Sequence, residues 1–133
     1  MKIEHILPAD IERRSMEIIE SELGPIELPP DEKDIIKRVV HTSADFDYVR
    51  NLRFSEGAVT KALEALKAGC TIVTDTNMAC MGISKPGLTK LGCQKVCFMA
   101  DDDVAAAARE QGTTRAQASM DTAAGLTGPL IIA

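Results

Sequence analysis

Three short apolar segments, separated by stretches with helical spacing, constrain the fold of this chain more than any other feature. They occupy residues 70–75, 95–99 and 128–133 and consist mainly of aliphatic residues and cysteine. Apolar runs of this length without polar alternation are typical of parallel strands that are covered on both faces. The pattern therefore predicts an α/β fold in three layers, with a mostly parallel sheet and helices on both faces.

Apolar residues at helical spacing occupy the intervals around these strands, and glycines stand where the helices should end. The expected helices cover residues 10–23, 31 to about 40, the stretch from a cap at Ser55 to a stop at Gly69, 84–91, 101 or 102 to 112, and 114–124. Residues 44–54 mix apolar and charged side chains without regular spacing. There we expect a loop that leads into a short strand.

Length and composition fit a single domain that spans residues 1–133. Apolar residues make up 45% of the chain, aromatic residues 3%, and tryptophan is absent, so the core should be aliphatic. Neither G-x-G-x-x-G nor G-x4-G-K-[ST] occurs in the sequence. The sheet is therefore expected to be Rossmann-like without a dinucleotide or P-loop nucleotide site.

The net charge and the length of the apolar runs limit the classes of partner that are expected for this chain. The net charge of −5 lacks the basic surface that nucleic-acid binding needs, so nucleic acid is not expected as a partner. The longest apolar runs are too short to cross a bilayer, and the first residues lack a signal-peptide pattern. A soluble, cytoplasmic protein without membrane association is the expectation.

The four cysteines, at positions 70, 80, 93 and 97, form no C-x2-C pair and accompany no paired histidines. That spacing favours neither a zinc site nor a disulfide framework. Cys70 and Cys97 lie inside apolar runs, so we expect them to be small buried side chains in a reducing compartment.

Histidine is the side chain whose ordinary pKa suits proton transfer near neutral pH, and the chain has only His5 and His41. His5 is expected to be a solvated residue. His41 is expected at or just beyond the end of an apolar helix and opens a polar string in which Asp45 could orient or charge the imidazole. The same spacing fits a histidine that merely stabilises a helix C-terminus, and the residues alone leave both interpretations open.

Other polar residues stand where α/β proteins place binding groups. Asp75 ends a strand, although it could instead cap the following helix. Thr114 and Arg115 open a helix after Gly112, which suits a carboxylate or phosphate but also fits an ordinary helix cap with an exposed arginine.

Two pairs of similar side chains have simpler interpretations. Arg13 and Arg14 precede Ser15 on the first helix, and only one of the two arginines can face a pocket. A solvated helix face explains them equally well. Met78 and Met81 are predicted to be flexible core filler.

Taken together, these segments resemble the precorrin-8X methylmutase family, whose members carry several of the same blocks in the same order. The matching blocks are Ile11-Glu-Arg-Arg-Ser15, Val39-Val-His-Thr-Ser-Ala-Asp-Phe-Asp-Tyr48, Phe54-Ser-Glu-Gly-Ala-Val59, Ile72-Val-Thr-Asp75 with Met78 and Gly82-Ile83, and Gly112-Thr-Thr-Arg-Ala116. They cover nearly the whole chain.

The resemblance implies an isomerase that moves a methyl group from C-11 to C-12 of precorrin-8X or its cobalt-containing counterpart, with no cofactor and no metal. It implies that His41 is the catalytic acid. The substrate is a corrinoid small molecule edged with carboxylates, and the groups expected to bind it are Arg14, Ser15, Asp75, Thr114 and Arg115. Similar proteins are homodimers with sites near the subunit interface.

The chain departs from the family pattern at its end. Typical members continue after the Ile-Ile strand with a loop that contributes to the substrate site, whereas this sequence stops at Ala133. We therefore expect a C-terminally short domain whose site a second polypeptide could complete. The alternative hypothesis is a non-catalytic relative that binds a tetrapyrrole or a partner subunit.

Overall fold

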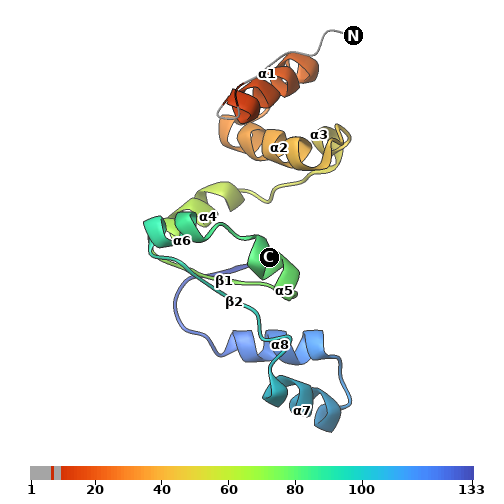
Figure 1. Cartoon of the computed structure of the whole chain (residues 1–133), viewed down its shortest axis with the longest axis vertical. Coiled ribbons are helices and arrows are strands. Elements are labelled where there is room, and N and C mark those ends of the chain that lie inside the picture. Colours follow the sequence, from red (N-terminus) through yellow and green to blue (C-terminus); the bar gives the residue numbers. More distant parts are fainter. Residues whose placement is uncertain (1–6, 8–9) are drawn as a thin grey trace. The chain divides into compact units, whose positions relative to one another are not determined.

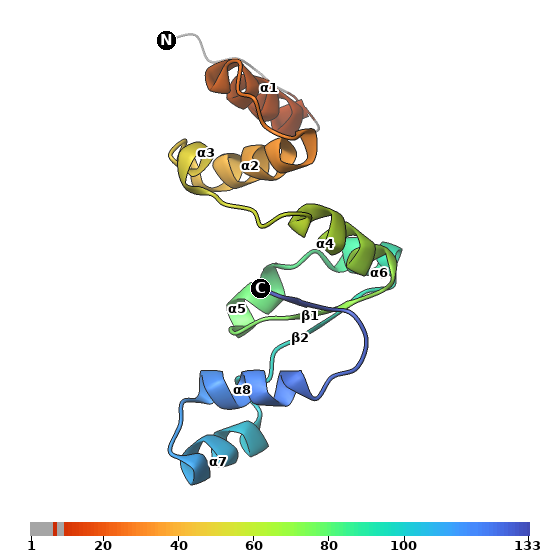
Figure 2. The same ribbon diagram turned by 180° about the vertical axis from the view of Figure 1, so that it is seen from behind.

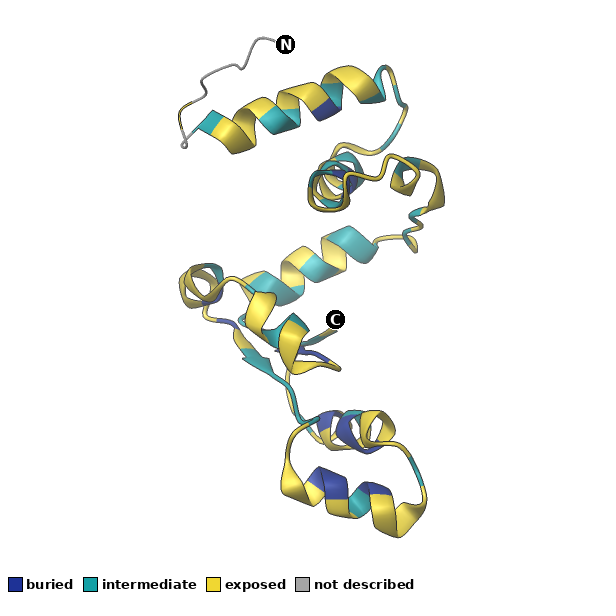
Figure 3. Ribbon diagram, turned by 45° about the vertical axis from the view of Figure 1, so that its right-hand side comes forward, coloured by how far each residue is buried: buried dark blue, intermediate teal, exposed yellow. Residues whose placement is uncertain are grey.

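The computed structural model describes residue 7 and residues 10–133, which form two compact units, Met1–Val59 and Thr60–Ala133. Each unit has buried residues of its own, drawn dark blue in Figure 3. The expectation that residues 1–133 form a single domain stays a prediction.

The first unit consists of helices that pack through aliphatic side chains. They are α1 (Ile11–Leu23), α2 (Pro30–Ser43) and the single turn α3 (Tyr48–Asn51), labelled in Figure 1. Proline in the first turn of α2, followed by Asp31 and Glu32, suits a helix N-terminus because proline needs no hydrogen-bond acceptor there and the dipole favours acidic groups. Ile19 of α1 and Ile36 and Val40 of α2 form the buried cluster of this unit.

The strand expected within residues 44–54 is wrong, because this segment forms a turn and α3. The Asp47 amide donates to Oδ1 of Asp45 (2.8 Å), and the Asn51 amide donates to the Asp47 carbonyl (3.0 Å). One helical turn brings Val49 and Leu52 against the Ile19–Ile36–Val40 cluster. Packing against the other helices, rather than local propensity, thus decides the structure of this segment.

The second unit contains a parallel sheet of β1 (Thr71–Val73), β2 (Gln94–Val96) and β3 (Leu130–Ile132). The strand order is β2-β1-β3, with β1 in register against Thr71↔Gln94 on one side and Thr71↔Leu130 on the other. Strands β1 and β3 lie within the segments that the sequence predicts, whereas β2 begins one residue before its predicted segment, and each strand is shorter than its apolar run. The α/β class and the parallel sheet are confirmed.

Five helices connect or precede these strands. They are α4 (Ala58–Lys67), which spans the boundary between the units, α5 (Asn77–Gly82), α6 (Lys85–Leu91), α7 (Asp102–Gln111) and α8 (Arg115–Ala124). Four of them were expected from the sequence. A helix after Asp75 was only an alternative there, and α5 is that helix, although its N-cap is Thr76 and not Asp75. Gly92 and Gly112 end α6 and α7 in the left-handed conformation, with φ of 67° and 64°.

Helices cover both faces of the sheet, as Figures 1 and 2 show from opposite sides. On one face, Cys70 and Ile72 pack with Leu88 of α6 and with Leu66 of α4. The opposite face borders a hollow of about 300 Å³ between α8 and the strands, lined by Val73, Leu130, Ile132, Met120, Ala123 and Ala124. The expected three layers are therefore present.

Helices α7 and α8 also pack against each other. Val104 and Ala108 of α7 are buried with Ala118 of α8, and Phe98 covers this cluster. Small alanine side chains allow two helices to approach closely, which explains why an alanine-rich stretch without aromatic residues can still form a core.

Across the described residues, no helix combines the length and the apolar character that crossing a membrane requires.

Candidate functional site

His41 and Ser15 meet on neighbouring helices of the first unit. The Nδ1 atom of His41 lies 2.8 Å from Oγ of Ser15, a hydrogen bond in which either atom can donate, depending on the tautomer. Both side chains are half-buried. Helix α2 continues to Ser43, so His41 lies inside its last turn and not at or beyond its end.

The packing of α1 on α2 explains why these two residues meet. Ser15 lies one turn before Ile19, and His41 follows Val40, so both polar groups lie beside the buried aliphatic contact between the helices. Positions four apart on a helix share one face, and the apolar seam therefore brings the hydroxyl and the imidazole together.

Ion pairs between the same helices surround this seam. Arg38 of α2 donates to Glu12 of α1 at 2.6 Å, and this hydrogen bond and charge hold the pKa of Glu12 below its usual value. Glu20 of α1 pairs with Lys37 of α2 at 2.7 Å and also with Lys33, and hydrogen bonds from the two lysines lower the pKa of Glu20. These contacts hold α1 and α2 in the register that joins Ser15 to His41.

A pocket of about 340 Å³ opens beside the hydrogen-bonded pair. Its walls are mainly apolar, and four of its residues bring polar groups. The lining residues are Ile11, Arg14, Ser15, Ile18, Ile19, Glu22, Val40, His41, Ala44 and Phe46. A concave apolar surface with a few convergent polar groups is the usual form of a small-molecule site.

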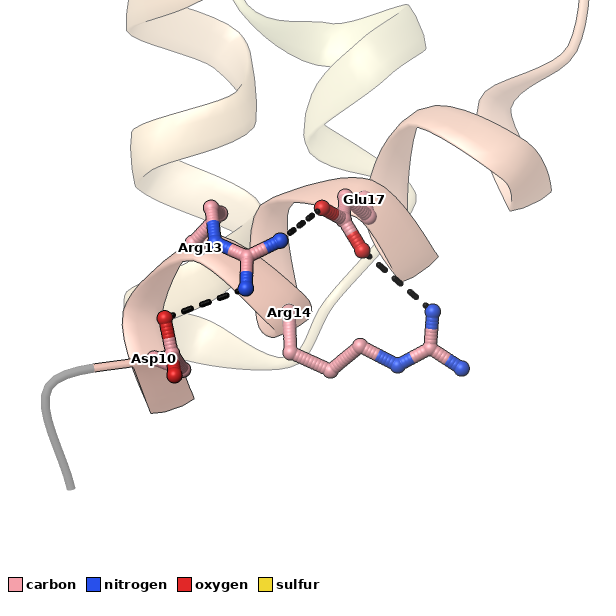
Figure 4. A network of polar contacts seen from close by, with 4 residues as sticks. All are labelled: Asp10, Arg13, Arg14 and Glu17. Carbon is pink, nitrogen blue, oxygen red and sulfur yellow. Dashed lines mark hydrogen bonds and ion pairs between the residues drawn. The ribbon is translucent and has the colours of Figure 1, made fainter. Parts of the chain in front are cut away.

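The two adjacent arginines of α1 have different surroundings, as Figure 4 shows. Arg13 donates to Asp10 at 3.0 Å and to Glu17 at 2.8 Å, and these acceptors raise its pKa. Arg14 contacts the other oxygen of Glu17 at 3.3 Å and lines the pocket. Only Arg14 lines the pocket beside His41, as the helix geometry predicts, whereas Arg13 lines a separate pocket with Met16 and Lys37.

Asp45 does not occupy the position beside His41 that its spacing suggested. The chain turns at Ala44, which has a left-handed φ of 56°, and Oδ1 of Asp45 accepts from the Asp47 amide at 2.8 Å. The partner of His41 is Ser15, which the sequence had indicated only as a substrate-binding residue. The one available signal was that Ser15 precedes the apolar Ile19 by one helical turn.

The remaining candidates belong to the second unit, where Asp75 follows the central strand of the sheet and Thr114 and Arg115 stand at the amino end of α8. Asp75 is exposed two residues after β1 ends. Thr114 is the N-cap of α8, and its hydroxyl accepts from the Gln117 amide at 3.2 Å, while Arg115 is the exposed first residue of that helix. Because α8 runs back along the sheet before β3, its amino end lies on the same side as the carboxyl end of β1, as Figures 1 and 2 show.

Other expectations require correction. Met78 and Met81 on α5 are 85% and 78% exposed, so they are not core filler. The reason is that Thr76, whose hydroxyl accepts from the Ala79 amide, caps a short helix with no buried residue. Cys70 is buried as expected, whereas Cys97 is only half-buried.

The described residues include no cluster of three or more His, Cys, Asp or Glu side chains that could hold a metal ion. His5 lies outside the described residues. The structure thus brings Arg14, Ser15 and His41 together in one unit. In the other unit, the amino end of α8, with Thr114 and Arg115, lies on the same side as the carboxyl end of β1, which Asp75 follows.

Comparison with known proteins places this geometry in a family. The sequence pattern of precorrin-8X methylmutase matches residues 10–133. The chain is 36% identical over 117 residues to a cobalt-precorrin-8 methylmutase from Leptospira interrogans, covering 88% of this chain and 53% of that protein. It is 46% identical over 89 residues to a cobalt-precorrin-8 methylmutase from Salmonella typhimurium, covering 67% of this chain and 42% of that protein.

A solved structure gives the same result. A precorrin-8X methylmutase from Thermus thermophilus superimposes with a TM-score of 0.82 at 36% identity, over 93% of this chain and 60% of that one. The chain spans about half the length of the curated relatives that it matches. From the match over residues 10–133 and the likeness in sequence and structure, the chain belongs to the precorrin-8X methylmutase family.

Proposed function

We propose that this chain provides the histidine-bearing part of an isomerase that moves a methyl group from C-11 to C-12 of precorrin-8X or cobalt-precorrin-8. The observation that supports it most is the pocket in which Ser15 holds His41 by a 2.8 Å hydrogen bond. The relatives are named cobalt-precorrin-8 methylmutase and precorrin-8X methylmutase. The proposed chemistry needs no cofactor.

In this proposal His41 is the catalytic acid. When the imidazole of His41 is protonated, its Nδ1–H donates to Oγ of Ser15, and its Nε2–H is left to donate to the macrocycle. Protonation of the macrocycle near the migrating centre withdraws electron density and lowers the barrier to the methyl migration. The hydrogen bond to Oγ of Ser15 limits the rotation of the imidazole, so the proton on Nε2 is presented in a defined direction.

The carboxylates of the corrin edge require cationic or hydrogen-bonding groups, because the chain as a whole has a net charge of −5. Arg14 and Ser15 offer such groups at the pocket beside His41. We assign the same task to Thr114 and Arg115 at the amino end of α8. Asp75 is assigned a different role, which is either to order the loop after β1 or to contact the substrate.

The proposal includes a second polypeptide, either another copy of this chain or a different chain, that contacts the second unit. Within the described residues β3 pairs only with β1, and Ile132 is 69% exposed beside an apolar hollow. These features support a homodimer or a completing second chain that covers this side. All four cysteines are free thiols, which supports a cytoplasmic location because that compartment keeps thiols reduced.

The test is turnover of precorrin-8X followed by its visible spectrum, because moving the methyl group off C-11 restores conjugation in the ring. We expect a shift to longer wavelength with the wild-type chain and none with His41→Ala. His5→Ala is the matched control, since it removes the only other histidine. Equal turnover by His41→Ala and the wild type would exclude His41 as the acid.

A second candidate function is a non-catalytic relative that binds a tetrapyrrole or a partner subunit. The exposed Ile132 beside the apolar hollow supports the partner-subunit form of this alternative. It predicts tetrapyrrole binding that survives His41→Ala and no spectral shift with either protein.

A further inference from the structure

Two buried thiols lie side by side at the start of neighbouring strands. Cys70 immediately precedes β1 and Cys93 immediately precedes β2. Thr71 pairs with Gln94 in the parallel register, so the two cysteines are the next neighbours along the same ladder. Their Sγ atoms are 3.9 Å apart, and the Gln94 amide donates to the Cys70 carbonyl at 3.0 Å.

This arrangement satisfies the backbone requirement for a disulfide. Neighbouring strands lie roughly 4.8 Å apart, and Cα atoms joined by disulfides are usually about 4.4–6.8 Å apart. The sulfur atoms already face each other, so side-chain rotation with small backbone adjustment would bring them to bonding distance.

The surroundings of the pair explain why both thiols persist in the reduced protein. Cys70 is 1% exposed and Cys93 is 8% exposed, and both pack against Ile72 and Leu88. Burial raises the pKa of the Cys70 thiol, and the Cys93 thiol donates to the Leu66 carbonyl at 3.3 Å. A thiol that stays protonated and shielded reacts slowly.

We propose that Cys70 and Cys93 form a dithiol that a two-electron thiol oxidant converts into an intramolecular disulfide joining β1 to β2. Two S–H bonds break and one S–S bond forms. Two protons and two electrons pass to the oxidant, and a dithiol reductant reverses the step. The inference does not depend on the proposed function, because it rests only on the two sulfur atoms and the strand register.

The crosslink has a mechanical consequence for the second unit. It closes the chain between positions 70 and 93, a segment that contains α5 and α6. Closing this loop restricts the unfolded chain more than the folded one, so the oxidised protein should unfold at a higher temperature. The loop after β1, which carries Asp75, would then follow a strand held covalently at its start.

The experiment uses the full chain, folded and fully reduced, with diamide as the oxidant. The azo group of diamide accepts the two hydrogens that the thiols lose and is reduced to the corresponding hydrazine. Because Cys70 and Cys93 are shielded, we expect a slow oxidation in which the intact mass falls by two hydrogens and a Cys70–Cys93 peptide appears in a non-reducing digest. The melting temperature should rise and return to its first value after reduction.

The control variant is Cys80→Ser/Cys97→Ser, which removes the two half-buried thiols and leaves only the proposed pair. It should lose both remaining thiols to diamide while staying at the same oligomeric size. Cys93→Ala should block the internal crosslink, and a circular dichroism spectrum like that of the wild type establishes that it is folded. The proposal is wrong if the folded Cys80→Ser/Cys97→Ser variant keeps both thiols after diamide treatment. It is also wrong if the digest of the wild type links Cys80 to Cys97 in place of Cys70 to Cys93.

Discussion

The hydroxyl of Ser15 lies 2.8 Å from Nδ1 of His41, and the two residues come from different helices. A pair this close ties the orientation of the imidazole to the packing of α1 on α2. Substitutions on either helix should therefore change the orientation of the His41 imidazole, even where the substituted residue does not contact it.

The first prediction concerns the hydroxyl itself. We expect Ser15→Ala to lower kcat about tenfold, because a hydrogen bond to a charged ring contributes roughly 1.5–3 kcal/mol and part of it is replaced by water. Single-turnover spectra would measure the change. Ser15→Thr keeps the hydroxyl and should restore most of the rate, and equal rates for the alanine variant and the wild type would exclude a positioning role.

The second prediction compares the adjacent arginines of α1. Arg14→Ala should raise KM about tenfold or more, since a charged hydrogen bond to a substrate carboxylate contributes roughly 1.5–3 kcal/mol. Arg13→Ala removes exposed ion pairs with Asp10 and Glu17 and should leave KM nearly unchanged. If the two variants have the same KM, Arg14 does not bind the substrate.

The third prediction tests the second group of residues. Arg115→Ala should weaken binding of the product by about 1.5–3 kcal/mol for the same reason. The matched control is Arg109→Ala, which removes an exposed arginine from the last turn of α7. Titration of the visible spectrum gives both dissociation constants, and an unchanged value for Arg115→Ala would contradict its assignment.

The fourth prediction concerns the core of the first unit. Ile36 is 2% exposed, whereas its neighbour Ile35 is 37% exposed. Ile36→Ala should lower the free energy of unfolding by about 2–5 kcal/mol through lost burial and a cavity. Ile35→Ala should cost far less. Urea denaturation measures both, and similar losses would contradict the packing described for α2.

The fifth prediction follows from Glu20, whose pKa is lowered from 4.5 by Lys33 and Lys37. A carboxyl group with a lowered pKa in the folded state stabilises that state above its unfolded pKa and loses the contribution as pH falls through the folded value. Wild type should therefore be more stable than Glu20→Gln at neutral pH, and the difference should close below pH 4.5. A Glu56→Gln variant, altered in an exposed turn, should follow the wild-type curve in acid denaturation. A constant difference between wild type and Glu20→Gln across this range would contradict the ion-pair explanation.

The sheet could be predicted because its evidence is local. A run such as Thr71–Val73 is β-branched and apolar in any context, and glycines mark the ends of the helices around it. The prediction overestimated strand length because only three residues of each run are paired in the parallel ladders. Apolar character extends further than pairing does.

Other features depend on contacts that a linear pattern does not contain. Val49 and Leu52 favour a helical turn only because the Ile19 cluster lies beside them. Likewise, Ser15 and His41 are 26 positions apart, and nothing near either residue indicates the other. The sequence indicated both as site residues through the family resemblance, and their roles stay predictions until the variants are measured.

The central position of β1 has a consequence for how the second unit is made. Residues 71–73 pair with residues 94–96 and with residues 130–132, so one of their two ladders joins points far apart in the sequence. Such pairings form slowly because a long loop must close first. On the ribosome, β1 and β2 emerge well before β3, and the edge of β1 that pairs with β3 stays open until residue 132 leaves the exit tunnel. An open strand edge can pair with another chain, so this interval of synthesis is exposed to aggregation.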